Sequence, residues 1–171
     1  THMLERVDWT RDLHFQTQTT IDTLDYSGNG WNAGSKLVVA ACSTSPKRSL
    51  INELPTGIQL PAPFKNMTLA HKGILAVDGP SFEHQDSAQE EISTLSEYLS
   101  RQEWKDEAPL IILCDDASFV STDFSNFLWV SFTRSNPASD IYGVHSFVQH
   151  KHWGCHGPLI IDARIKPHHA P

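Results

Sequence analysis

The residue best suited to chemistry is Arg134, which with Thr133 follows an apolar segment at 127–132. If that segment is a strand, Arg134 stands at its end, where the planar guanidinium could bind a carboxylate through two parallel hydrogen bonds. In open α/β sheets, ligands usually bind beside the carboxyl ends of the strands. The plainer alternative is a salt bridge from Arg134 to an aspartate such as Asp140. The sequence leaves both interpretations open.

Asp115 and Asp116 follow a second apolar segment, at 108–114. Two neighbouring carboxylates could bind a divalent cation or act as an acid–base pair. Adjacent residues of a strand point to opposite faces, so the two carboxylates can share a ligand only if the strand has already ended. We therefore favour a structural role, in which they cap the next helix and pair with Arg134.

A histidine-rich segment lies at 150–156, and His168 and His169 follow near the end. Imidazole and thiolate groups are zinc ligands, and the possible ligands in this segment are His150, His152, Cys155 and His156. Their spacing lacks the Cys-x-x-Cys pair of structural zinc sites, so no metal is predicted and a surface or interface loop is expected. The glycine-rich segment 25–36 precedes a strand pattern instead of a helix, which disfavours phosphate binding. No serine lies in a Gly-x-Ser-x-Gly turn, so nucleophilic catalysis is not predicted.

The elements that would position these residues alternate between apolar runs and one clear amphipathic helix. Ser87 and Glu90 have the spacing of a capping box, and apolar residues behind them recur at helical spacing, which predicts a helix over 87–104. A short helix is expected at 46–54, and the proline-rich segment 55–65 is expected to be irregular. Strands are predicted at 17–23, 36–42, 73–78, 108–114, 127–132, 141–150 and 158–164. This order predicts an α/β fold, a single three-layer domain with a parallel or mixed central sheet of about five or six strands flanked by helices.

The composition excludes several classes of protein. Thirteen basic and twenty acidic residues give a net charge of −7, and without a basic stripe we expect no nucleic-acid partner. No apolar run approaches the roughly 20 residues of a spanning helix, so no transmembrane segment is expected. The three cysteines are expected to be free thiols, and the chain is expected to be cytoplasmic. Residues 1–3 are typical of a cloning remnant, with 4–171 as the domain.

Two motifs resemble the C-terminal domain of UbiD-type decarboxylases. The first runs from Asp115-Asp116 to Phe-Leu-Trp-Val-Ser-Phe-Thr133-Arg134-x-x-Pro-x-x-Asp140, and the second is Gly154-Cys-His-Gly-Pro-Leu-Ile-Ile-Asp-Ala-Arg-Ile-Lys166. The segment 22–36 resembles the branch assigned to menaquinone biosynthesis. Together the similarities span most of residues 4–171.

The resemblance implies a carboxy-lyase parent that removes CO2 from aromatic or unsaturated acids, including prenylated hydroxybenzoate in ubiquinone or menaquinone biosynthesis. It implies prenylated FMN held with a divalent metal and a monovalent cation, and assembly as a homo-oligomer. The flavin site and the catalytic residues of that family lie in an upstream domain without a counterpart here. No catalytic residue can therefore be assigned, and the chain is expected to bind no cofactor and to be inactive alone.

On this basis we expect a truncated C-terminal domain that closes one side of the substrate cleft and takes part in oligomer contacts. The candidate cleft residues are Thr133, Arg134, Trp153 and Gly154, and Asp115, Asp116 and Asp140 are rim or structural charges. The alternative is a freestanding module that binds a small carboxylate or a partner chain.

Overall fold

A mixed five-stranded sheet forms the centre of the protein in the computed structural model, which describes residues 1–20 and 32–167. The strand order is β3-β4-β5-β9-β6. The three inner strands are parallel, and the two edge strands run antiparallel to their neighbours. The bounds are β3 (Met67–His71), β4 (Ile74–Asp78), β5 (Leu110–Cys114), β9 (Leu159–Asp162) and β6 (Ile141–Gly143). The predicted α/β class with a mixed sheet is confirmed.

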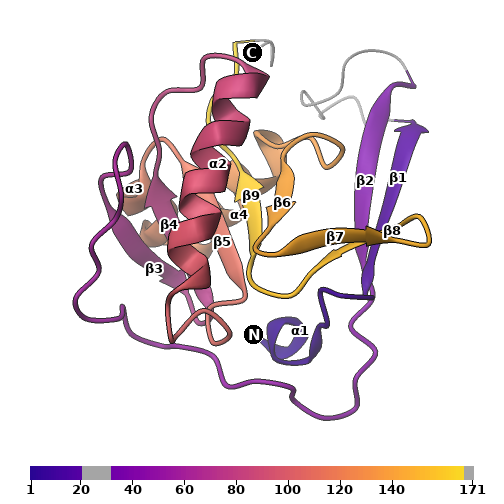
Figure 1. Ribbon diagram of the computed structural model, residues 1–171, viewed down its shortest axis with the longest axis horizontal. Helices are drawn as coiled ribbons and strands as arrows, with labels where there is room; N and C mark the ends of the chain where they lie inside the picture. The colour runs from indigo at the N-terminus through magenta and orange to yellow at the C-terminus, as the bar shows by residue number, and fades with distance from the viewer. Residues whose placement is uncertain (21–31, 168–171) are drawn as a thin grey trace.

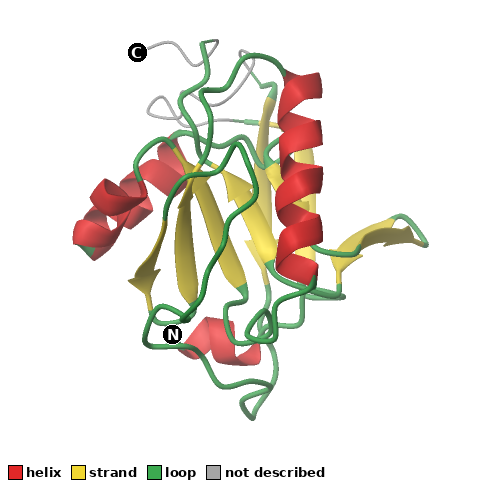
Figure 2. Ribbon diagram, turned by 60° about the vertical axis from the view of Figure 1, so that its left-hand side comes forward, coloured by secondary structure: helices red, strands yellow, loops and turns green. Residues whose placement is uncertain are grey.

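The inner strands are buried on both faces, as their near-continuous apolar sequences require. All five residues of β5 and all four of β9 are buried. Side chains such as Leu75 and Ile111 face the helix α2 (Gln85–Ser100), and side chains such as Ala76 and Ile112 face the opposite core. Helices α3 (Ala117–Thr122) and α4 (Phe124–Thr133) cover that second face. Figures 1 and 2 show the resulting three layers, with α2 on one side of the sheet and α3 and α4 on the other.

Helix α2 begins two residues before the predicted start. His84 is its N-cap: the imidazole accepts a hydrogen bond from the backbone N–H of Ser87 at 3.1 Å, and the Ser87 hydroxyl accepts one from the N–H of His84. The capping box is therefore formed by His84 and Ser87, and the prediction of Ser87 as the cap was wrong. Ile92, Leu95 and Leu99 are buried, as their helical spacing predicts.

The segment 127–132 was wrongly predicted as a strand, because it lies within helix α4. The carboxylate of Asp123 accepts a hydrogen bond from the N–H of Asn126 at 2.9 Å and so caps the first turn. A short apolar run does not by itself distinguish a strand from a helix. Two features select the helix here: the N-cap at Asp123, and the burial of one helical face, formed by Phe127, Val130 and Ser131.

Two further predictions fail in the loops. The segment 46–54 is not a helix, because the N–H groups of Lys47 and Ile51 donate to the distant carbonyls of Glu5 and Glu107. The segment 141–150 is two strands instead of one, since the chain turns after β6 and continues as β7 (Ser146–Gln149). The segment 55–65 contains no helix or strand, as expected.

Two small antiparallel ribbons lie beside the main sheet. Strands β1 (Leu13–Thr19) and β2 (Gly34–Val39) form one, and β7 with β8 (His152–Cys155) forms the other. Strand β1 covers the first part of the predicted strand 17–23, and residues 21–23 lie outside the described residues. Both ribbons are on the right of Figure 1, above the short helix α1 (His2–Arg6). None of the described helices combines the length and the apolar character that crossing a membrane requires.

Candidate functional site

Charged residues gather where the parallel strands end. Strands β4, β5 and β9 run in the same direction, with Asp78 beside Cys114 and Leu113 beside Asp162, so their carboxyl ends share one edge of the sheet. This is the edge at which open α/β sheets usually bind ligands. We call the following residues the charge cluster: Asp115, Arg134, Asp140, Asp162, Arg164 and Lys166.

Arg164 is fully buried within the charge cluster. Its Nε and Nη2 donate to the two carboxylate oxygens of Asp162 at 2.9 and 2.7 Å. Its Nη1 donates to Glu91 at 2.6 Å and to the carbonyl of Pro80 at 3.0 Å. Burial alone would lower the pKa of Arg164, but the hydrogen bonds and charges of Asp162 and Glu91 raise it above its usual value. The guanidinium therefore ties β9 to α2 and to the segment that follows β4.

Lys166 is the second buried cation, with 1% of its surface exposed. Its Nζ donates to the carbonyl oxygens of Asp162 at 2.8 Å and Arg134 at 3.1 Å, and lies 3.4 Å from a carboxylate oxygen of Asp140. The Asp140 carboxylate also accepts the N–H of Asn136 at 2.7 Å. The ammonium thus holds the end of α4 and the following turn against β9.

Arg134 lies at the C-cap of α4 and not at the end of a strand. Its Nη1 donates to the carboxylate of Asp115 at 3.3 Å, and about a third of each side chain is exposed. The same Asp115 oxygen accepts the N–H of Ile165 at 2.9 Å, and Asp116 caps α3 by accepting the N–H of Phe119 at 2.8 Å. This geometry matches the structural alternative for both aspartates. A role for Arg134 in a substrate cleft stays a prediction.

Thr133 and Gly154 are held by local contacts. The Thr133 hydroxyl donates to the carbonyl of Trp129 within α4, at 2.6 Å. A Cβ on Gly154 would lie 2.8 Å from the carbonyl oxygen of Trp9, so a glycine is required for β8 to pack against that backbone. Neither contact reaches a ligand site, and the candidacy of both residues stays untested.

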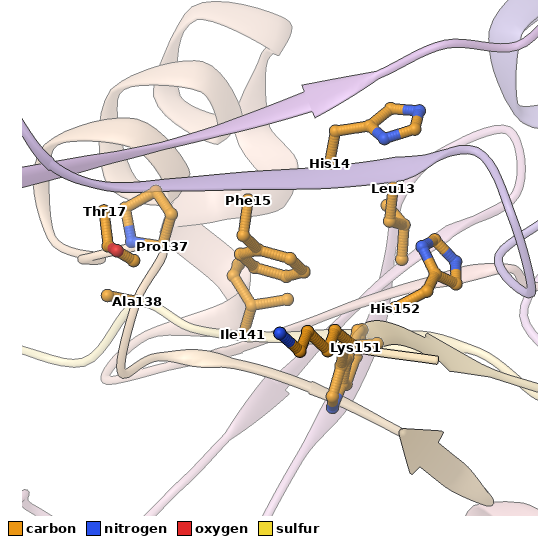
Figure 3. Close-up of a pocket in the computed structure, with 10 residues that line it drawn as sticks. Leu13, His14, Phe15, Thr17, Pro137, Ala138, Ile141, Lys151 and His152 are labelled. Atoms are coloured by element: carbon orange, nitrogen blue, oxygen red, sulfur yellow. The ribbon is translucent and has the colours of Figure 1, made fainter. Parts of the chain in front are cut away.

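Trp153 lines a cavity of about 410 Å³, which we call the ribbon pocket. Its ring packs edge-on against Phe15, with the ring centres 5.5 Å apart. Figure 3 shows Lys151 extending toward Ile141 beside Phe15, whereas His14 lies on the other side of β1. The lining residues are Leu13, His14, Phe15, Thr17, Pro137, Ala138, Ile141, Lys151, His152 and Trp153. Two aromatic rings beside an ammonium group suit a small aromatic carboxylate, whose ring can pack on the side chains while its charge pairs with Lys151.

The sequence-based candidates therefore fall into two separate places. Arg134, Asp115 and Asp140 are brought together around Lys166, whereas Trp153 lies in the ribbon pocket. Sequence reasoning placed Arg164 and Lys166 in the second motif but named neither as a site residue. The signal available was two cations directly after a buried strand, a position where a charge must be either exposed or paired.

The histidine-rich segment forms the turn after β7 and the strand β8. The Nε2 of His152 lies 3.0 Å from the carbonyl of Thr10, the thiol of Cys155 is buried, and His156 packs on Phe147. Among residues 1–20 and 32–167, no three histidine, cysteine, aspartate or glutamate side chains are placed to hold a metal ion. His168, His169 and most of the glycine-rich segment 25–36 lie outside the described residues.

The described residues do not fit the flavin and metal centre that the resemblance implies. Asp140 and Asp162, the buried carboxylates of the charge cluster, already bind Lys166 and Arg164. Binding a metal there would require breaking these ion pairs within a buried site. We therefore assign no catalytic step to this part of the chain.

Comparison with known proteins supplies the family. The model of the 3-octaprenyl-4-hydroxybenzoate carboxy-lyase C-terminal domain matches residues 1–41. The chain is 32% identical over 173 residues to a Chlamydia pneumoniae protein named as a subunit of 4-hydroxybenzoate decarboxylase, covering 96% of this chain and 26% of that protein. Together these two matches support a domain of the UbiD C-terminal type. An uncharacterised protein of Chlamydia trachomatis is also 32% identical, over 165 residues, with 96% of this chain and 26% of the relative covered.

The family model and the Chlamydia relatives match different lengths of the chain. The family model covers the N-terminal 41 residues, whereas the motifs at 115–140 and 154–166 lie within the longer alignment to the Chlamydia relatives. The chain spans about a quarter of the length of the relatives it matches. No solved structure matches the chain.

Proposed function

We propose that this UbiD C-terminal-type domain belongs to an aromatic-acid carboxy-lyase and forms part of the wall of its substrate cleft. The observation that carries the proposal is the 32% identity, over 96% of the chain, to a protein named as part of a decarboxylase. The part-exposed pair of Arg134 and Asp115 in the charge cluster supports it, because the sheet edge at the carboxyl ends of parallel strands is where ligands usually bind. Thr133 and Arg134 lie on that edge, and the Trp153–Gly154 segment lies beside the ribbon pocket.

In this proposal the chemistry takes place outside the described chain. The parent uses prenylated FMN with a divalent metal and a monovalent cation, all held by an upstream domain. The parent is a homo-oligomer in the cytoplasm and acts on an aromatic or prenylated acid in ubiquinone or menaquinone biosynthesis. The 171-residue chain is inactive without that upstream domain.

A second candidate is a freestanding module that binds a small carboxylate. The ribbon pocket favours it, since Lys151 stands beside the Phe15 and Trp153 rings in a cavity large enough for a single aromatic ring. His150 and Lys151 form the two-residue loop of the β7–β8 hairpin, and their positive φ, 50° and 64°, is the conformation that such a loop requires. This loop sets Lys151 at the mouth of the ribbon pocket.

One experiment separates the two candidates. The 171-residue chain alone, and a longer protein that includes the upstream region and its flavin, are each incubated with 4-hydroxybenzoate, and phenol is measured by chromatography. We expect turnover only from the longer protein, and a lower kcat/KM for its Arg134→Ala variant. Arg101→Ala, which removes an exposed arginine at the end of α2, is the control and is expected to leave turnover unchanged.

Phenol formed by the 171-residue chain alone would overturn the proposal, as would inactivity of the flavin-loaded longer protein. The binding module instead predicts saturable chemical-shift changes around Lys151 and Trp153 when 4-hydroxybenzoate is added to the 171-residue chain.

A further inference from the structure

The outer face of α3 and α4 is apolar. Phe124, Leu128 and Phe132 recur every four residues along α4, and Trp129 lies beside them on the same side of the helix. Phe119 of α3 adjoins this row, since its carbonyl accepts a hydrogen bond from Asn126 of α4. Trp129 is 63% exposed and Phe132 is 65% exposed. We call these five side chains the aromatic face.

A helix at the surface of a globular protein normally turns charged and polar residues outward. Neither 117–122 nor 124–133 contains a charged residue. The opposite side of α4 is already occupied, because Phe127 and Val130 are buried against the sheet. Phe124 also touches the rings of His71 and Phe127, but about half of the aromatic face stays uncovered by the described chain.

The size of the face suits an interface between proteins. Four aromatic rings and one leucine, each about half exposed, present about 500 Å² of apolar surface. A patch of this extent is near the upper end of the range for monomers, about 300–600 Å², and such patches are often functional. Two such faces in contact would bury about 1,000 Å² of apolar surface, and with a polar rim they approach the area of a specific dimer interface.

The charges at the ends of α4 favour a particular arrangement. Asp123 stands at the amino end and Arg134 at the carboxyl end, about 15 Å apart for a helix of this length. If two copies of α4 lie antiparallel, Arg134 of each copy, which also pairs with Asp115 of its own chain, comes near Asp123 of the other. The helix dipoles are then also opposed, which is their favourable orientation. A two-fold axis near Leu128 and Trp129 produces this arrangement.

We propose that a second copy of this chain docks on the aromatic face, with the two α4 helices antiparallel about a two-fold axis. This contact rests on the proposed function, in which the parent is a homo-oligomer, and it assigns the contact between copies to the aromatic face. An uncharged aromatic stripe flanked by opposite charges is complementary to itself when reversed, which is the requirement for a symmetric contact.

The first test measures the mass of the 171-residue chain by sedimentation between about 5 and 200 µM. We expect a reversible dimer, weakened at least tenfold by the double substitution Trp129→Ser and Phe132→Ser. Both side chains are mostly exposed, so the variant is expected to fold. Val148→Ser on β7 is the matched control, because Val148 is 71% exposed but lies on another element. A chain that stays monomeric at 200 µM would overturn the proposal and leave the face to another part of the longer protein.

The second test checks the geometry. In a Cys42→Ser background, which removes the exposed native thiol, Leu128→Cys is expected to form a disulfide between two copies because it lies near the proposed axis. Val148→Cys serves as the control. Equal rates of cross-linking for the two variants would overturn the antiparallel arrangement.

Neither test depends on turnover. A monomeric chain within an active longer protein would contradict only the docking surface, and a dimeric chain from an inactive longer protein would contradict only the proposed function.

Discussion

The charge cluster and the aromatic face invert the usual distribution of residues in a protein. The cluster buries two cations, Arg164 and Lys166, and the face exposes large rings such as Trp129 and Phe132. Yet the two regions are next to each other, because the carbonyl of Arg134, at the end of α4, accepts a hydrogen bond from Lys166.

The two regions differ in whether their side chains find interaction partners within the chain itself. Every buried charge of the cluster has an oppositely charged partner within 3.4 Å among the described residues. Within residues 1–20 and 32–167 the aromatic face is covered only in part, by the contacts of Phe124 with His71 and Phe127, and the core beneath α4 is already filled. The buried charges of the cluster therefore serve the fold, and the face is left for association. The following predictions test this contrast.

The largest effect is expected at Lys166. Substitution by methionine keeps most of the side-chain volume but leaves the Asp140 carboxylate buried without its cation. Removing one partner of a buried pair typically destabilises a protein by about 3–5 kcal/mol. Urea denaturation measures the loss, and Lys65→Met, at an exposed lysine, is expected to change the free energy of unfolding by less than about 0.5 kcal/mol. A similar small change for Lys166→Met would show that the cluster is not needed for folding.

A comparison of two phenylalanines in α4 sharpens the contrast. Phe127 is 5% exposed and Phe132 is 65% exposed, on opposite sides of the same helix. Phe127→Ala is expected to destabilise the chain by about 3 kcal/mol or more, because it leaves a cavity under α4. Phe132→Ala is expected to change stability by less than about 0.5 kcal/mol at concentrations where the chain is monomeric. Equal losses in thermal unfolding would mean that the aromatic face belongs to the core.

A smaller effect is expected at the partly exposed edge of the charge cluster. Arg134 and Asp115 form an ion pair that is about one-third exposed, and such pairs contribute about 0.2–1 kcal/mol. A double-mutant cycle with Arg134→Ala and Asp115→Ala is expected to give a coupling energy in that range, which falls at high salt. A coupling energy of several kcal/mol would instead mean that this pair contributes to stability as much as the buried ion pairs of Arg164 and Lys166.

The smallest effect concerns the thiols and leaves stability unchanged. Burial raises the pKa of both Cys114 and Cys155 to about 12, so both stay protonated and unreactive near pH 8. Cys42 is exposed. A thiol reagent at pH 8 is expected to modify one cysteine in the folded chain and three after denaturation. Rapid modification of two or three in the folded chain would show that the sheet opens easily.

The sequence by itself determined the elements whose signals are local and strong. The apolar run at 108–114 has the length of a strand, and its near-continuous apolar sequence is typical of a strand covered on both faces. The spacing of Ile92, Leu95 and Leu99 required an amphipathic helix. These patterns, together with the resemblance to the UbiD C-terminal domain, were sufficient for the fold class and the family.

Only the tertiary structure decided the state of 124–133 and the partners of the charges after β9. An apolar run suits a strand or a helix equally, and here the cap by Asp123 and the packing of Phe127 select the helix. Sequence order likewise could not show that Lys166 reaches the carbonyl of Arg134, 32 residues earlier. Contacts between distant segments depend on how the layers pack, and that packing buried the charges and left the aromatic rings outside.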